Sequence, residues 1–299
     1  MDYSGGTIRD QGRISRSADF FRVNMRATRV LFASEATILL LLLFWKLTNI
    51  DPDRDQAGLM ALGAFGLLAA GASLYLLSKS LAGAASSRDW LICICTVATA
   101  VLGFADYSIT FFGLYLLLRD RGDLNAKAAG IVAIALAVQA VWAPLFFSAL
   151  SFVFLQIDAG MVGWLLGWVI PGASWTNTTI TTPSGHDVII TAPCASFHNL
   201  SLASLCWVTL TMLHRPYWVK SDIYVGLGAL AIQVSLNICR LVFVCMSLPM
   251  YEFWHDGAGK HIFSGIATAG AIVLVQIFLA NDPESLKHRR QGWVGRNVA

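Results

Sequence analysis

The sequence predicts an all-α polytopic membrane protein with about eight transmembrane helices, and three observations support this fold class. Hydrophobic residues make up 56% of the 299 residues and charged residues only 13%, whereas soluble domains carry about 25% charged residues. The mean hydropathy is +0.63. Lys and Arg crowd a few short segments, and neither occurs in residues 128–214. This pattern is typical of apolar spans that are joined by charged loops.

Six apolar runs are candidate spans, because a bilayer core needs about 20 apolar residues per helix. They are residues 30–48, 57–78, 128–148, 194–213, 223–248 and 260–280.

The longer run 90–118 is interrupted by Gly103, Asp106 and Ser108, so its length allows one tilted helix or two short spans. The loops before and after it, 79–89 and 119–127, both carry basic residues, which favours a cytoplasmic position for both. The run must then cross twice, as a short hairpin. Eight crossings follow, with both termini in the cytoplasm.

Four regions follow from this topology. We expect a cytoplasmic arm at 1–29, N-terminal spans at 30–127, a catalytic core at 128–280 and a cytoplasmic tail at 281–299. The arm carries several arginines and lacks an apolar core, so it does not resemble a cleavable signal peptide.

The stretch 149–193 should lie outside the membrane or at its surface. Residues 149–172 are apolar, but counting them as a span would leave the basic loop after residue 213 on an inconsistent side. We therefore expect an amphipathic helix in the outer interface, broken at Gln156, Asp158 and Gly160; an ordinary buried span is the alternative. Further on, Thr alternates with Ile or Val on both sides of Pro183-Ser184-Gly185, which predicts a small extracytoplasmic β-hairpin.

Cys194 is the one cysteine that borders a polar segment, since the other five lie inside apolar runs. Proline favours the first helical position, so Pro193 predicts that Cys194 lies in the first turn of a helix. The helix dipole would there favour a thiolate. A small residue packed at an interface is the alternative interpretation.

Arg240 lies among Leu, Val, Ile and Phe, inside a predicted span. Its guanidinium keeps its charge, so it must pair, extend to the interface or face a polar cavity. Asn237, one turn earlier, shares its helix face.

His255 and Asp256 are predicted at the outer mouth of the last span, where Gly257 and Gly259 allow close backbone approach. A histidine at this place can transfer protons near neutral pH. His261, further along the same helix, is the competing candidate.

The predicted topology brings Cys194, Arg240 and His255 to the outer half of three consecutive helices, where we expect them to meet in one pocket. Cysteine and histidine form the nucleophile–base pair of covalent catalysis. Arginine is suited to hold a thiolate or an oxyanion. The combination favours an enzyme.

Residues 128–280 resemble the exosortase/archaeosortase family of multi-pass membrane cysteine enzymes. The resemblance rests on the order and spacing of several short motifs: Pro144, Leu155-Gln156, the Gly-rich segment and hairpin, Ala192-Pro193-Cys194, Asn237-x-x-Arg240, and His255-Asp256-x-x-Gly259-x-x-x-Phe263. The family usually follows its cysteine with Ser or Thr and then Gly, whereas this chain has Ala195 and Ser196. That departure bears on which substrate signal is accepted.

The resemblance implies a nucleophilic Cys194, a partner cation at Arg240 and an acid/base at His255, supported by Asn237, Asp256 and Gly259. It implies cleavage of a C-terminal sorting signal from exported proteins, with an acyl-enzyme that an amine or water resolves. The implied substrates carry a short motif, a transmembrane helix and a basic tail. The implied location is the bacterial cytoplasmic (inner) membrane, in contact with lipid and with the active site facing outside.

Two other classes of function stay open. A transporter could use Arg240 and His255 to line a polar path, and it should tolerate loss of Cys194. A non-catalytic export-assembly subunit would use the arginine only to pair helices. The sequence shows no cofactor motif, phosphate loop or metal-ligand cluster, so we expect neither a cofactor nor a metal. The basic residues are interleaved with acidic ones, which argues against a nucleic-acid partner.

Overall fold

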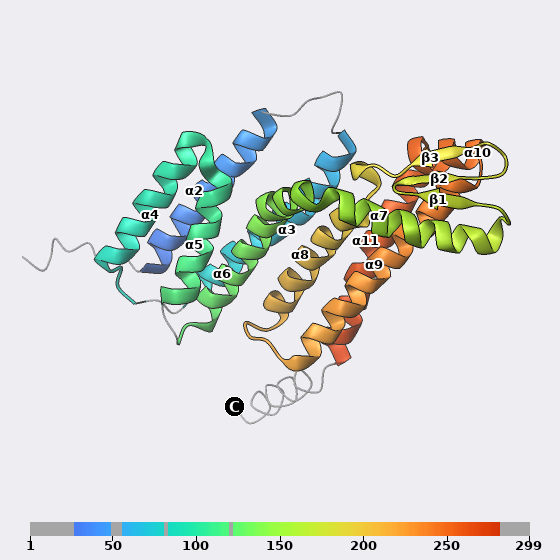
Figure 1. Cartoon of the computed structure of the whole chain (residues 1–299). Helices are drawn as coiled ribbons and strands as arrows, with labels where there is room; N and C mark the ends of the chain where they lie inside the picture. Colours follow the sequence, from blue (N-terminus) through green and yellow to red (C-terminus); the bar gives the residue numbers. More distant parts are fainter. Residues whose placement is uncertain (1–26, 49–55, 81–82, 120–121, 282–299) are drawn as a thin grey trace, which may run out of the picture.

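The computed structural model of the chain describes residues 27–48, 56–80, 83–119 and 122–281, so most of the predicted arm and tail lies outside the described residues. These residues form an all-α bundle with one small sheet (Figure 1). The longer helices are α2 (Ala27–Thr48), α3 (Gln56–Ser78), α4 (Ser87–Thr99), α5 (Ala105–Arg119), α6 (Leu124–Ala137), α7 (Ala143–Val169), α8 (Ser196–His214), α9 (Lys220–Met246) and α11 (Ala258–Asn281).

The run 90–118 forms two helices, as one of the two interpretations predicts. The π-helical turn η2 (Ala100–Phe104) joins α4 to α5, and within it Gly103 has a φ of 96°. This left-handed conformation is readily accessible only to glycine. Trp45 of α2 donates its indole N–H to the carbonyl of Ala100 at 3.2 Å and thereby supports the turn.

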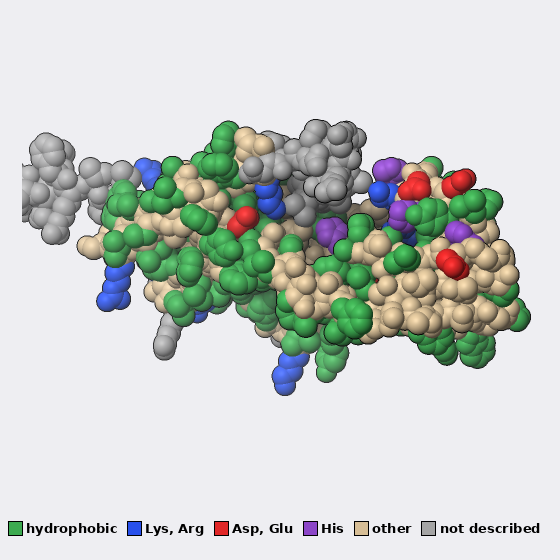
Figure 2. Space-filling view, turned by 45° about the horizontal axis from the view of Figure 1, so that its top comes forward, with side chains coloured by type: hydrophobic (Ala, Val, Ile, Leu, Met, Phe, Trp, Pro, Cys, Tyr) green, Lys and Arg blue, Asp and Glu red, His purple; other side chains and the backbone are tan. Residues whose placement is uncertain are grey.

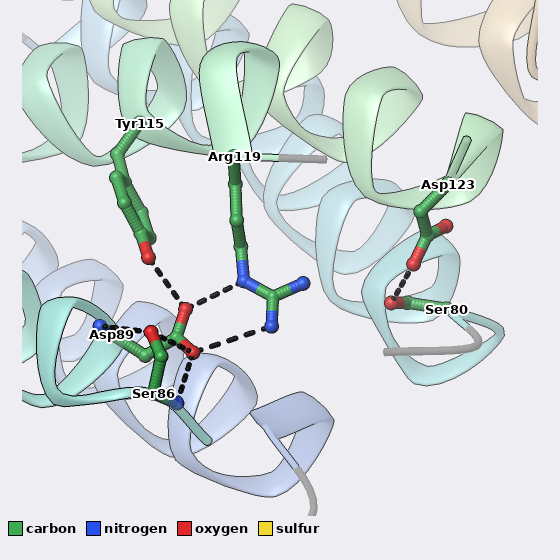
Figure 3. A network of polar contacts seen from close by, with 6 residues as sticks. All are labelled: Ser80, Ser86, Asp89, Tyr115, Arg119 and Asp123. Atoms are coloured by element: carbon green, nitrogen blue, oxygen red, sulfur yellow. Dashed lines mark hydrogen bonds and ion pairs between the residues drawn. The ribbon is translucent and has the colours of Figure 1, made fainter. Parts of the chain in front are cut away.

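A buried carboxylate ties the far ends of this hairpin together (Figure 3). Asp89 of α4 accepts hydrogen bonds from Tyr115 Oη and Arg119 Nε, both at 2.5 Å, and from the backbone N–H of Ser86 at 2.7 Å. In one continuous helix, residues 89 and 119 would lie roughly 45 Å apart. The ion pair therefore requires the chain to fold back at Gly103.

Several segments far apart in the sequence meet at the same end of the bundle. The backbone N–H of Ala27 donates to the carbonyl of Gly83 at 2.8 Å, and Asn125 donates its side-chain amide to the carbonyl of Lys79 at 3.2 Å. Ser80 donates its hydroxyl to the Asp123 carboxylate. The basic loops on either side of α4 and α5 thus lie on one side of the molecule, as their charge predicts.

Five stretches of the described residues are long and apolar enough to cross a membrane, which identifies a membrane protein: Ala27–Lys46, Ser87–Arg119, Leu124–Val169, Lys220–Met246 and Ala258–Asn281. Ser87–Arg119 folds back at Gly103, and Leu124–Val169 bends. One stretch therefore does not correspond to one crossing of the membrane. Eight crossings remain a prediction.

Helix α7 corrects two expectations. It continues from α6 through the π-helical turn η3 (Val138–Trp142), and it runs unbroken past Gln156, Asp158 and Gly160. The two polar side chains do not break it because each bonds a group outside the helix: Gln156 donates to the Asn177 side chain at 3.3 Å, and Asp158 accepts from the backbone N–H of Ser196 at 2.8 Å.

The exposed face of α7 is not polar either, so the helix is not amphipathic. It exposes large apolar side chains, among them Phe152, Ile157, Met161, Trp164 and Trp168. Figure 1 shows α7 crossing over α8 and α9 rather than running alongside them.

The predicted hairpin is a three-stranded antiparallel meander, ordered β1 (Ser174–Thr176), β2 (Thr179–Thr181) and β3 (Asp187–Ile189). The turn after β2 includes Pro183-Ser184-Gly185, as expected. The sequence reading missed the turn between β1 and β2, where Asn177 has a φ of 56°. Asparagine is among the residues that tolerate this conformation.

A glycine on α7 allows the sheet to pack against this helix. A Cβ atom on Gly163 would lie 2.6 Å from Cε3 of Trp175 in β1, a distance at which one of them must move. On the sheet, Ile180 and Val188 are buried in a cluster with Val162 and Leu166 of α7. The sheet therefore packs directly against α7.

We predict that Gly163→Ala displaces Trp175 and lowers the free energy of unfolding by about 1–3 kcal/mol, the usual cost of overpacking. Thermal unfolding of the purified protein in detergent measures the effect. Gly167→Ala is the matched control, because a Cβ at Gly167, one turn along α7, meets nothing within 4 Å. Equal unfolding temperatures for the two variants would contradict this packing.

Candidate active site

Three helix ends meet beside the sheet. Helix α8 begins at Ser196, α9 ends at Met246 and α11 begins at Ala258, while α10 (Leu248–Tyr251) and the π-helical turn η5 (Glu252–Asp256) connect the last two. In Figure 2, most of the visible acidic and histidine side chains gather at this end of the molecule. The segments that carry Cys194, Arg240 and His255 therefore converge here.

Cys194 lies just before α8, not in its first turn as predicted. Pro193 and Cys194 belong to a 3-10 turn, η4 (Ala192–Cys194), and the N–H of Cys194 donates to the carbonyl of Thr191 at 2.9 Å. Proline suits the first turn of a 3-10 helix as well as that of an α-helix, because its missing N–H would have no partner there, which explains the error. The Cys194 side chain is buried, with 5% of the residue exposed.

Asn237 holds the backbone of this turn from α9. Its side-chain amide donates to the carbonyl of Cys194 at 2.9 Å and to the hydroxyl of Ser196 at 3.0 Å. Its own oxygen accepts from Asn199 at 3.2 Å. Because Asn237 is buried and fully paired, it fixes Cys194 against the helix that carries Arg240.

Phe197, in the first turn of α8, anchors the same segment to α7. Its ring centroid lies 4.8 Å from that of Phe154 and 5.4 Å from that of Phe147. The backbone at Ala195 has φ −64° and ψ 140°, and Ser196 is already helical, so neither position needs a glycine. The departure from the family pattern is thus compatible with a well-packed turn.

Arg240 is half-buried on α9, one turn after Asn237, which bonds the Cys194 carbonyl. Its Nε donates to the carbonyl of Trp254 at 3.3 Å, in the segment just before His255. The guanidinium therefore lies between the cysteine turn and the histidine turn. In the described part of the chain, no hydrogen bond joins Cys194, Arg240 and His255 directly.

His255 lies in η5, with its Nδ1 2.8 Å from Oδ1 of Asp256. Its ring stacks on Tyr251 at 4.7 Å between centroids, and Tyr251 also meets the ring of His186 at 6.0 Å. Burial raises the pKa of Tyr251, and the negative charges of Asp256 and of a Cys194 thiolate raise it further. The tyrosine therefore stays a neutral donor at physiological pH.

A cavity of about 660 Å³ opens beside the cysteine turn. Pro193 and Ala195, the residues on either side of Cys194, line it together with Arg240. His261 lines it as well, whereas His255 is not among its described lining residues. The competing candidate thus shares a cavity with the arginine, whereas His255 follows Trp254, whose carbonyl bonds Arg240.

Gly257 and Gly259 permit the tight turn that carries His255. A Cβ on Gly257 would lie 2.9 Å from the carbonyl oxygen of Glu252, and one on Gly259 would lie 2.7 Å from Cε3 of Trp254. Both contacts involve rigid groups, so larger residues would push η5 away from α11. Gly259 thus has a steric role beside the site.

The sequence reading did not assign site roles to Asp158, His186 or Tyr251. The sequence predicts Asp158 only as a helix breaker, although an acid inside an apolar run carries the same desolvation cost that distinguishes Arg240. The positions of His186 and Tyr251 depend on the sheet register and on η5, which carry no sequence signal of their own.

Comparison of the chain with protein-family models, with curated proteins and with solved structures finds no match. The proposals below therefore depend on the residues, on their geometry and on the motif resemblance of residues 128–280.

Proposed function

We propose that the protein is a membrane-embedded cysteine peptidase or transpeptidase that cleaves a C-terminal sorting signal from exported proteins. Cys194 is the nucleophile, Arg240 its cationic partner and His255 the acid/base. The observation that carries the proposal is that Arg240 lines one cavity together with Pro193 and Ala195, the residues on either side of Cys194, while Asn237 of the same helix bonds the Cys194 carbonyl.

The chemistry follows from these groups. The Cys194 thiolate attacks the scissile carbonyl, and Arg240 stabilises the oxyanion that forms. The C–N bond then breaks, and the imidazolium of His255 gives its proton to the leaving amine. A thioester remains on Cys194. An amine or water, deprotonated by the same imidazole, attacks the thioester and releases the thiolate.

The proposed location is the cytoplasmic membrane of a bacterium, with the cysteine turn facing outside. Basic residues in the connections at the opposite end of the bundle support this orientation: Lys79, Arg88, Arg119, Lys127, Arg215 and Lys220. In this orientation α7 lies in the outer interface, where its exposed tryptophans suit the headgroup region. A substrate with one transmembrane helix would present its outer end to Cys194.

We expect Cys194→Ala and Cys194→Ser to insert normally and to abolish processing, because neither supplies a thiolate. The assay follows, by immunoblot, a host protein that ends in a short motif, an apolar span and a basic cluster. Cys206→Ala is the matched control, since Cys206 lies on α8 and lines the same cavity. Full processing by Cys194→Ala would exclude the mechanism and favour the transporter, which needs no thiol at this place.

Separate replacement of His255 and His261 shows which of the two histidines is the acid/base. We expect His255→Ala to slow processing at least about 100-fold, the usual loss for such a group, and His261→Ala to stay within a few-fold of the parent. Single-turnover cleavage rates in detergent measure both. The reverse order would assign the acid/base to His261 and leave His255 a structural role.

A further inference from the structure

The N-terminus of α8 takes its cap from a distant helix. Ala195 occupies the cap position and offers no side-chain oxygen, so the first N–H groups of α8 need another partner. The backbone N–H of Ser196 donates to Oδ2 of Asp158 at 2.8 Å, across 38 residues of sequence. Asp158 belongs to α7 and is only 5% exposed.

Ser196 is bonded both by the Asp158 carboxylate and by the side-chain amide of Asn237, which also holds Cys194. The Ser196 hydroxyl accepts a hydrogen bond from Asn237 at 3.0 Å. The second N–H of the same amide donates to the carbonyl of Cys194 at 2.9 Å. Asp158, Ser196 and Asn237 thus form one buried chain of hydrogen bonds that ends on the backbone of the nucleophile.

The position of Asp158 also determines which anion the helix terminus stabilises. The positive end of a helix dipole favours a nearby anion, and at α8 that anion is the Asp158 carboxylate. Under the proposed function, stabilisation of a Cys194 thiolate is then left to Arg240, the cation that lines the cavity beside the cysteine turn.

We propose that Asp158 is a positioning residue for Cys194. Its hydrogen bond to Ser196 N–H sets the start of α8 and, through Asn237, the orientation of the cysteine turn. Helix α7 is thereby the support on which the nucleophile is placed. This inference rests on the proposed function for its kinetic consequence, but the positioning itself has a readout that needs no substrate.

The substrate-free test is the labelling rate of Cys194 by N-ethylmaleimide in the full-length protein, read at the Cys194 peptide by mass spectrometry. Asp158→Ala removes the acceptor, so the turn loosens and labelling should rise at least about threefold. Asp158→Asn keeps an oxygen that can accept from Ser196 N–H, so labelling should stay close to the parent rate. Equal rates for the parent and Asp158→Ala would overturn the proposal.

The kinetic test compares the same variants on the host substrate. Asp158→Ala should lower kcat about 10- to 100-fold with KM within about twofold, since misplacement of a reacting group by about 1 Å costs this much. Asp158→Asn should recover most of the rate. Gln156→Ala is the matched control, because Gln156 lies two residues away and bonds Asn177 near the sheet instead.

Three outcomes would contradict the role of Asp158: a normal kcat in Asp158→Ala, no recovery in Asp158→Asn, or a rise in KM alone. Failure of the proposed function looks different, since Cys194→Ala would then still process the substrate. If Cys194→Ala is inactive and Asp158→Ala is fully active and labels at the parent rate, only the positioning role fails.

Discussion

The buried hydrogen bonds that join Asp158, Ser196 and Asn237 are the constraint on which the candidate site depends. Polar groups inside an apolar bundle are costly unless they are paired, and here each pairing also fixes a backbone atom at or next to Cys194, the proposed nucleophile. Asn237 bonds the Cys194 carbonyl, and Asp158 bonds the first N–H of α8. The cysteine turn is therefore held from two helices, α7 and α9, and Arg240 of α9 lines the cavity beside it.

The rest of the fold supplies the supports for this arrangement. The sheet packs on α7 because Gly163 leaves room for Trp175, and the phenylalanines of α7 pack on Phe197 at the start of α8. On the other side, Gly257 and Gly259 bring η5 close to α11, so that the Trp254 carbonyl reaches Arg240. In the N-terminal half, Asp89 closes a separate hairpin at the opposite end of the bundle.

The sequence predicted those features that depend on composition or on a single unusual residue. The all-α membrane class followed from apolar runs, the α4–α5 fold-back from loop charge and Gly103, and the interest of Arg240 from its charge inside an apolar span. The sequence did not predict features that depend on distant pairing. Asp158 looked like a helix breaker because its partner is 38 residues away, and Pro193 suits a 3-10 turn as well as the first turn of an α-helix.

The covalent intermediate is the most direct test of the central claim. The purified protein is mixed with a host substrate, quenched in acid and digested, and the Cys194 peptide is weighed by mass spectrometry. The account predicts that this peptide carries the substrate's acyl fragment as a thioester, which neutral hydroxylamine removes. An unmodified Cys194 peptide at every time point, while the substrate is being cleaved, would contradict the account.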